Sequence, residues 1–374
     1  MPNNTPLTLL GGLSAAQFMR RHWQKKPLLV RGAIPGMQAP LSRRELFELA
    51  AREGVESRLV QQGAKGWKLG RGPFARLPAL KQAAWTLLVQ GVDLHDERAH
   101  RLLRPFGFIP AARLDDLMIS YATDGGGVGP HFDSYDVFLL QAHGKRRWRY
   151  GRQKDLRLRD DVPLKILANF QPEFDEVLEP GDMLYLPPQY AHDGIAIGEC
   201  MTCSVGFRVP RRRELARELL LRLADEAADV AGDALYSDAS QPATVSSAAI
   251  PEALMQFARR SVESAMRDPH ALARSLGEVL TEPKPDVWFE AGARPGRLHA
   301  VRLDRRSRML HDDRHIFING ESWRAAGRDA TLMRRLADDR MLDGRAVAGA
   351  SPQARELLAS WCEAGWLHAT GEGA

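Results

Sequence analysis

The pattern of hydrophobic and polar positions changes character twice along the chain, near residues 114 and 210. Before residue 114, the capping-box pair Ser14 and Gln17 predicts one helix, and Ser42 is expected to cap a second. From 114 to 209, short β-rich runs are separated by Gly and Pro, and their regular spacing predicts a sandwich or barrel rather than a parallel sheet. The strands expected in this region are Leu117–Ala122, Ser134–Gln141, Arg146–Gly151, Glu176–Leu178, Met183–Leu186 and Met201–Arg208, and the segment Trp23–Val30 is expected to turn into a further strand before it.

After Pro210 the pattern becomes helical. Glu214–Val230 places leucines near one face, Ala231–Ile250 has the composition of a loop, and Pro251–Leu280 predicts another helix. A boundary is expected at Thr281–Pro285. The remainder mixes strands and helices in an order that suits a small winged-helix-like unit: strands Ala300–Leu303 and Ile316–Ile318, helices Thr331–Asp338 and Pro352–Ala364.

Length and composition narrow the class of protein. A chain of 374 residues is expected to form two or three domains, and 44% hydrophobic with 26% charged residues is typical of soluble globular proteins. The longest apolar runs are too short to span a bilayer, and residues 1–13 lack the features of an export signal. Three cysteines cannot build a disulfide framework. We therefore expect a cytoplasmic protein with no membrane partner.

The net charge of +5 has two interpretations that charge alone does not separate. The arginines form a solvated surface, or they attract a nucleic-acid-rich partner. A basic C-terminal stretch motivates direct nucleic-acid binding, although acidic residues are interspersed with it. The arginines in question are Arg294, Arg297, Arg302, Arg305, Arg306 and Arg308.

A glycine-rich segment leads into the strongest chemical signal, His131 and Asp133. Residues two apart on a strand face the same way, so both side chains can point into a barrel. His192 follows a turn, a short strand and a proline-rich bend, which suits a third ligand arriving from a distant strand. Two histidines and a carboxylate form the triad that leaves open positions on iron(II) for O₂ and a co-substrate. The segment thus predicts an iron site.

Two other pairs share the His-x-acid spacing, His95 with Glu97 and His311 with Asp313. Both lie in strongly polar stretches, so we interpret them as solvated surface. Cys200 and Cys203 have CxxC spacing, but they lie in a run that reads as strand, which favours a structural role over a redox or zinc site.

Arg146 is the candidate for binding a co-substrate carboxylate, because a planar guanidinium pairs with a carboxylate through two hydrogen bonds. After an expected turn at Gly144, Arg146 shares one strand face with Trp148 and Tyr150. These aromatic residues favour that face as the buried one. The alternative is that this basic segment is an exposed hairpin that serves only solubility.

Four segments together resemble the bacterial ribosomal oxygenases of the JmjC/cupin class, which are arginine 3-hydroxylases of a large-subunit ribosomal protein. The segments are Gly125–Gln141, Gly144–Arg149, Leu178–Pro188 and Ser204–Arg208. The similarity covers essentially the whole chain and is most specific over 114–209. It implies an α+β fold: a double-stranded β-helix (jelly-roll, cupin or JmjC) catalytic domain over 1–209, with its barrel core at about 114–209. A helical dimerisation region over 210–282 and a winged-helix-like domain over 283–374 are expected to follow.

The resemblance also assigns roles. It implies that His131, Asp133 and His192 hold Fe(II), and that Arg146, assisted by Ser120, binds 2-oxoglutarate, with O₂ as the second co-substrate. Asp116, Tyr135 and Ser204 are the expected contacts for the target arginine, as carboxylate, aromatic wall and hydroxyl. The expected partners are a ribosomal protein substrate and a second copy of the chain. We further expect the loop Gly125–Gly129 to let the substrate backbone approach closely.

Two alternatives stay open. The same chemistry can act on another residue, such as a ribosomal histidine or a histone lysine. Alternatively, the barrel is a metal-binding or ribosome-associated module without turnover, for which His131 and His192 are needed but Arg146 is not.

Overall fold

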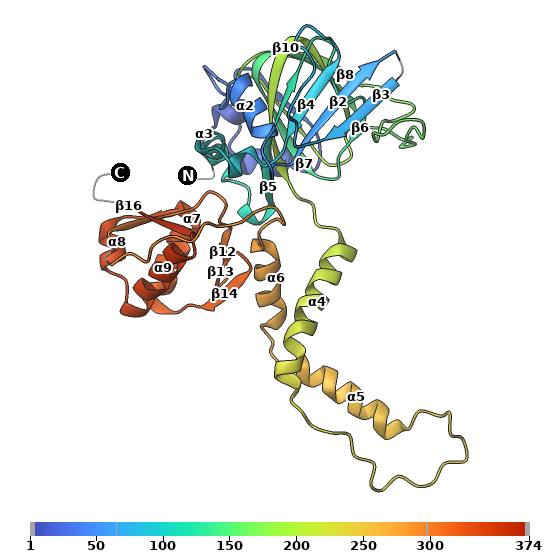
Figure 1. Ribbon diagram of the computed structural model, residues 1–374, viewed down its shortest axis with the longest axis vertical. Helices are drawn as coiled ribbons and strands as arrows, with labels where there is room; N and C mark the ends of the chain where they lie inside the picture. The colour runs from blue at the N-terminus through green and yellow to red at the C-terminus, as the bar shows by residue number, and fades with distance from the viewer. Residues whose placement is uncertain (1–3, 65, 297, 371–374) are drawn as a thin grey trace. The chain divides into compact units, whose positions relative to one another are not determined.

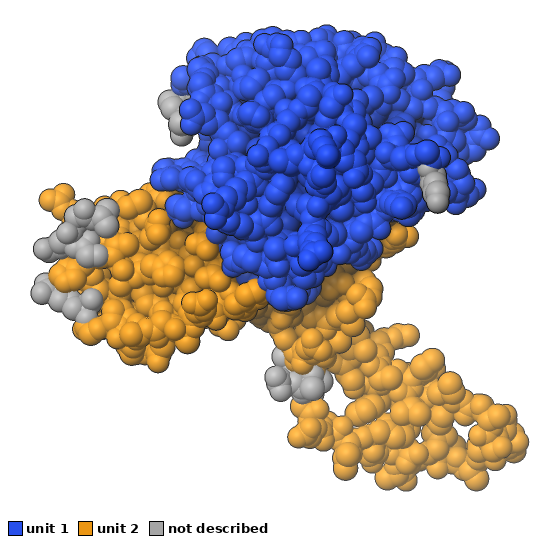
Figure 2. Space-filling model, turned by 45° about the horizontal axis from the view of Figure 1, so that its top comes forward, with its two compact units in different colours: residues 1–209, 285–287 blue, residues 210–284, 288–374 orange. Residues whose placement is uncertain are grey.

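The structure is a computed structural model that describes residues 4–64, 66–296 and 298–370 (Figure 1). The chain divides into two compact units (Figure 2). The first is Met1–Val209 with Pro285–Val287, and the second is Pro210–Lys284 with Trp288–Ala374.

The predicted N-terminal helices are confirmed. α1 (Ala15–Arg21) begins at Ser14 and α2 (Arg43–Ala50) begins at Ser42, each with both hydrogen bonds of a capping box. This unit has further short helices: the 3₁₀ helix η1 (Thr8–Leu10) precedes α1, and α3 (Glu97–Arg101) with the 3₁₀ helices η2 (Val92–Leu94), η3 (Arg104–Phe106) and η4 (Ala111–Arg113) comes after α2.

One ten-stranded sheet dominates the first unit. Its strands follow the order β1-β9-β7-β10-β5-β4-β2-β3, with β6 paired to β10 and β8 to β7, and every pairing is antiparallel. This order confirms the prediction of an antiparallel barrel-type architecture rather than a parallel sheet. The strands are β1 (Leu28–Val30), β2 (Ser57–Gly63), β3 (Gly66–Arg71), β4 (Trp85–Val89), β5 (Leu114–Ala122), β6 (His131–Phe132), β7 (Asp136–Gly151), β8 (Phe174–Leu178), β9 (Met183–Leu186) and β10 (Ala191–Phe207).

The predicted turn at Gly144 is wrong. Gly144 has φ +62° inside the continuous strand β7, and a side chain there would collide with the carbonyl of Glu199 on β10. The register of β7 and β10 shifts beside it, between Ile197 and Thr202. Gly144 therefore allows a β-bulge between these two long strands. On the same face of β7, odd-numbered residues such as Leu139 lie before the bulge and even-numbered residues such as Trp148 lie after it.

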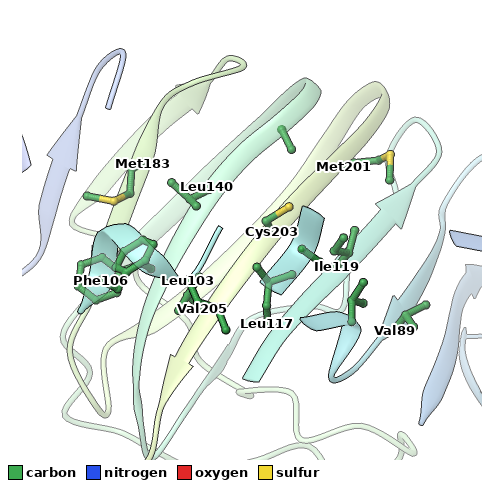
Figure 3. Close-up of a cluster of buried hydrophobic side chains, with 14 of the residues drawn as sticks. Val89, Leu103, Phe106, Leu117, Ile119, Leu140, Met183, Met201, Cys203 and Val205 are labelled. Atoms are coloured by element: carbon green, nitrogen blue, oxygen red, sulfur yellow. The ribbon is translucent and has the colours of Figure 1, made fainter. Parts of the chain in front are cut away.

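The two faces of this sheet have different cores. Figure 3 shows part of the larger cluster, which includes Phe106 and odd-numbered residues of β10 and β5 such as Cys203 and Ile119. The smaller cluster on the opposite face contains Trp148 and Tyr150 of β7. Alternate burial along Lys145–Tyr150 confirms that Arg146 shares the buried face with these aromatic residues.

The second unit begins with helices α4 (Arg212–Ala231), α5 (Glu252–Ala265) and α6 (Ala271–Thr281). The single helix expected over Pro251–Leu280 is wrong, since the chain leaves the helix at Met266 and resumes at Ala271. Pro269 lies in the break, lacks a backbone N–H and disfavours helical geometry at the residue before it.

The C-terminal part has its own core around Leu336, Leu358 and Trp361. Two three-stranded sheets, β15-β11-β16 and β12-β13-β14, combine with three helices. Their bounds are β11 (Ala300–Leu303), β12 (Met309–His311), β13 (His315–Ile318), β14 (Glu321–Arg324), α7 (Gly327–Asp339), β15 (Met341–Leu342), α8 (Gly344–Ala348), α9 (Pro352–Glu363) and β16 (Leu367–Thr370). Within the described ranges, the helices are all too short or too polar to cross a membrane.

Candidate metal centre

Three side chains converge where β6 meets β10. His131 of β6 lies directly opposite His192 of β10 in the antiparallel register, which puts both rings on one face. The ring centroids are 4.3 Å apart. Asp133 follows two residues after His131, and its Oδ2 lies 3.9 Å from Nε2 of His131 and 3.7 Å from Nε2 of His192. Potential ligand atoms of all three residues lie within 4.8 Å of one another, so the structure brings the predicted triad together.

Hydrogen bonds orient both imidazoles in the same way. Nδ1 of His131 lies 2.9 Å from the Gly129 carbonyl oxygen, and Nδ1 of His192 lies 3.0 Å from that of Tyr190. A carbonyl can only accept, so each Nδ1 carries a proton, and in the neutral imidazole Nε2 then holds the lone pair that a metal can bind. Burial, and next the neighbouring His131, lower the pKa of His192 to about 4. Both effects favour the neutral imidazole, which is the form that binds metal.

Contacts within the barrel explain two glycines of the 125–129 loop, and the expected close approach of a substrate backbone to this loop stays a prediction. A side chain on Gly126 would lie 2.5 Å from the carbonyl oxygen of Trp85, and one on Gly127 would lie 2.6 Å from that of Gly194. The loop also exchanges two backbone hydrogen bonds with Ala196. The loop therefore lies close to β4 at Gly126 and to β10 at Gly127, and its hydrogen bonds hold it against the strand that carries His192.

Arg146 is buried on the same strand face that carries the histidine pair. It lies opposite Ala196, four residues along β10 from His192. Its Nε donates to Sγ of Cys200 at 3.4 Å. Its Nη2 is buried and has no hydrogen-bond partner among the residues that the structure describes. A buried guanidinium without a carboxylate is costly, so this geometry fits a site whose anion is a ligand.

Ser120 is connected to Arg146 through Cys200, the residue that Arg146 contacts, and through Ala122, which pairs with Cys200. It is buried on β5, two residues before Ala122 on the same face, and Ala122 pairs with Cys200. Opposite Ser120 is Thr202, whose hydroxyl donates to Gln141 at 2.9 Å. No motif predicted the contacts of Cys200 with Arg146 and of Gln141 with Thr202, because they depend on how β7 and β10 pair around the bulge.

Asp116 is fixed by donors from a neighbouring segment. Its Oδ2 accepts from the backbone N–H of Gly91 at 2.9 Å and from Nε2 of Gln90 at 3.1 Å. Arg58 in turn donates to Oε1 of Gln90 at 2.8 Å, which directs the amide nitrogen toward the carboxylate. Gln90 and Arg58 lie far from Asp116 in the sequence, and no motif there pointed to them.

Tyr135 links the Asp116 carboxylate to the metal centre. A methyl group added to Gly206 would lie 3.8 Å from both Oδ1 of Asp116 and Cε2 of Tyr135. Burial, followed by the charges of Asp133 and Asp116, raises the pKa of Tyr135 well above its ordinary value, so its hydroxyl stays protonated. Ser204 is buried on β10 and pairs with Met118 of β5, two residues from Asp116 on the same face. The three predicted substrate contacts thus lie in one region.

The competing His-x-acid pairs do not form comparable clusters. Within the described residues, the only group of three or more potential ligands is the one at His131, Asp133 and His192. The cysteines are free and buried, in agreement with a structural role, although Cys200 also contacts Arg146.

The arginines of the basic C-terminal stretch that the structure describes all make interactions within the protein. Arg294 pairs with Glu356 and Glu363, and Arg306 pairs with Asp304. Arg302, Arg305 and Arg308 also make interactions, while Arg297 lies outside the described residues.

Comparisons with known proteins give a consistent result. A family model described as a JmjC domain matches residues 101–215, and one described as a ROXA-like winged helix matches residues 264–368. The ribosomal protein uL16 3-hydroxylase of Escherichia coli (strain K12) is 37% identical over 277 residues, covering 74% of this chain and 73% of the relative. A "probable ribosomal oxygenase" of Haemophilus influenzae is 38% identical over 214 residues, 53% and 50% of the two chains.

The solved structures agree over nearly the full length. The X-ray structure of E. coli YcfD matches with a TM-score of 0.83 and 31% identity, over 95% of this chain and 98% of YcfD. A structure of YcfD in complex with cobalt and 2-oxoglutarate matches with a TM-score of 0.80, at the same identity and coverage. On this evidence, the chain belongs to the JmjC-domain ribosomal oxygenases and combines a cupin-type barrel with a ROXA-like winged helix.

Proposed function

We propose that this protein is an iron(II)- and 2-oxoglutarate-dependent oxygenase that 3-hydroxylates an arginine of a ribosomal protein. The observation that carries the proposal is the buried Arg146, whose Nη2 has no partner in the described part of the chain, on the strand face that also carries His192. A module that bound metal without turnover would have no use for this cation. The relatives named above as a ribosomal protein 3-hydroxylase and ribosomal oxygenases support the same activity.

The donor set fits iron(II). Two imidazole nitrogens and one carboxylate oxygen form the triad that would leave positions on the ion open for O₂ and a co-substrate. When bound together with 2-oxoglutarate and O₂, iron(II) supplies the chemistry that converts 2-oxoglutarate to succinate and CO₂ and inserts one oxygen atom into a C–H bond. His131 and His192 would hold the ion through Nε2, with Asp133 as the third ligand.

The remaining residues position the reactants. Arg146 binds the distal carboxylate of 2-oxoglutarate, and Ser120 adds a hydroxyl donor to it. Asp116 pairs with the guanidinium of the substrate, Tyr135 provides an aromatic wall, and Ser204 offers a hydroxyl. A carboxylate at this place favours a cationic arginine over a neutral histidine. Gln90 and Arg58 keep Asp116 in position, so that the substrate carbon is held close to the metal.

We extend the proposal to the rest of the chain. Residues 1–209 form the catalytic domain, 210–282 mediate homodimerisation, and 283–374 form the winged helix. α5 supports a dimer, because it has no buried residue and exposes Met255, Val262 and other apolar side chains. The partners are then a ribosomal protein and a second copy of the chain, and the protein acts in the cytoplasm, where ribosomes are made.

Turnover of 2-oxoglutarate by the purified protein tests the chemistry. Protein supplied with Fe(II), ascorbate and labelled 2-oxoglutarate should form succinate, and ribosomes lacking the modification should accelerate this formation while one arginine gains 16 Da. His192→Ala should abolish both signals. Metal binding without any succinate would contradict the oxygenase. Succinate with a mass gain on a histidine would contradict the assignment of arginine alone.

A further inference from the structure

Arg146 and Trp148 each carry a buried hydrogen-bond donor on the same face of β7, the one that also buries Tyr150. Arg146 and Trp148 are two residues apart, and each is only 5% exposed. The Arg146 guanidinium carbon lies 5.7 Å from the centre of the Trp148 ring. Within the described residues, neither Nη2 of Arg146 nor Nε1 of Trp148 has a hydrogen-bond partner. A buried donor without an acceptor costs free energy, so two adjacent ones indicate a shared ligand.

The orientation of the indole places this donor away from strand β10. A side chain added to Gly194 would lie 2.6 Å from Cζ3 and Cη2 of Trp148 and 2.9 Å from Cε3. This edge of the six-membered ring is opposite Nε1 in the indole, so the N–H points away from Gly194. The ring also lies near both Arg146 and the metal centre, because its centre is 5.7 Å from the guanidinium carbon and 5.8 Å from the ring of His192.

We infer that Trp148 is a further co-substrate-binding residue, whose indole N–H donates a hydrogen bond to a carboxylate oxygen of 2-oxoglutarate. The inference rests on the proposed function, since it takes 2-oxoglutarate as the ligand of Arg146. A dicarboxylate that extends from the metal centre toward Arg146 passes along the indole. Its oxygens are acceptors only, which matches two donors that lack acceptors.

Replacement of the indole by a phenyl ring removes the donor while keeping an aromatic side chain. Binding of 2-oxoglutarate to the Zn(II)-substituted protein is measured by calorimetry, which needs no turnover. Trp148→Phe should weaken binding about tenfold to a hundredfold, the usual range for a hydrogen bond to a charged group. Trp361→Phe is a matched control: Trp361 is also buried with an indole N–H that lacks a partner in the described residues, but it lies in the second unit. That variant should bind as the wild type does.

The controls separate the inference from the proposed function. If the wild type does not bind 2-oxoglutarate, or Arg146→Met binds it equally well, the proposed ligand is wrong. If the wild type binds, Arg146→Met loses binding and Trp148→Phe binds unchanged, the inference about Trp148 alone is wrong.

A spectroscopic measurement covers the case in which Trp148→Phe does not fold. In Zn(II)-substituted protein labelled with ¹⁵N-tryptophan, the Trp148 indole signal is assigned by its loss in Trp148→Phe or, failing that, in Trp148→Tyr. Addition of 2-oxoglutarate should move this ¹H signal downfield, as hydrogen bonding to a carboxylate does, and leave the signal of Trp361 in place. An indole signal for Trp148 that stays in place at saturating 2-oxoglutarate would overturn the inference.

Discussion

Replacement of Arg146 by methionine should weaken 2-oxoglutarate binding and stabilise the free protein at the same time. Methionine preserves most of the side-chain volume and removes the charge. In the free protein the guanidinium is buried, donates to Sγ of Cys200, and leaves Nη2 without a partner among the described residues. The two effects have opposite signs because the arginine serves the ligand rather than the fold.

The size of each effect follows from the surroundings of the side chain. Removal of one partner from a buried ion pair costs about 3–5 kcal/mol, so 2-oxoglutarate affinity should fall by about two to nearly four orders of magnitude. In the free protein, burial of an unpaired charge costs several kcal/mol. The hydrogen bond to Cys200 and the cation–π contact with Trp148 recover about 1 kcal/mol each. The variant should therefore gain about 1 kcal/mol or more, which raises Tm by about 2–4 °C.

Calorimetry of the Zn(II)-substituted protein measures the affinity, and thermal unfolding of the free protein measures the stability. Arg147→Met is the control, since Arg147 is the next residue on the opposite, exposed face and pairs with Asp175 on the surface. This control should change neither quantity by much. A variant Arg146→Met that loses several degrees in Tm, or that still binds 2-oxoglutarate as tightly as the wild type, would refute the reasoning.

Three further predictions test other parts of the site and fold. Gln90→Leu removes the donor that orients Asp116, so KM for the ribosomal substrate should rise about tenfold with 2-oxoglutarate affinity unchanged; equal losses of both would contradict it. Asp133→Ala removes one metal ligand and should weaken Mn(II) binding at least a hundredfold, as measured by titration. The pKa of Glu45 is lowered to about 2, first by the backbone N–H of Ser42, so its stabilisation is complete above pH 4.5 and is lost as pH falls toward 2. Glu45→Gln should consequently make the decline of Tm between pH 5 and pH 2 shallower, and an unchanged decline would argue against this contact.

The metal triad was predictable because it depends on local rules. Alternation along an extended segment predicts that His131 and Asp133 face the same way, which holds although β6 ends at Phe132, and the turn and bend before His192 mark a strand that arrives nearby. The helix starts at Ser14 and Ser42 were predictable for the same reason, since all the residues of a capping box lie within four consecutive positions of the sequence.

Features that depend on contacts between distant segments were not predictable from the residues alone. Gly144 reads as a turn in the sequence, and only its partner β10 shows that it is a bulge. The hydrogen bonds that connect Arg58, Gln90 and Asp116 join three separate strands or loops, and no spacing in one segment encodes them. The helix break at Pro269 is different, since a proline is a signal within one segment and could have been used to predict it.

The central claim is tested most directly by mass spectrometry of ribosomal proteins from cells with and without this gene. The account predicts one peptide that carries an additional 16 Da on an arginine in wild-type cells. The addition should be absent after deletion of the gene, restored by the intact gene, and not restored by His192→Ala. Identical ribosomal proteins in all four strains would contradict the proposed substrate class, and restoration by His192→Ala would contradict the metal centre itself.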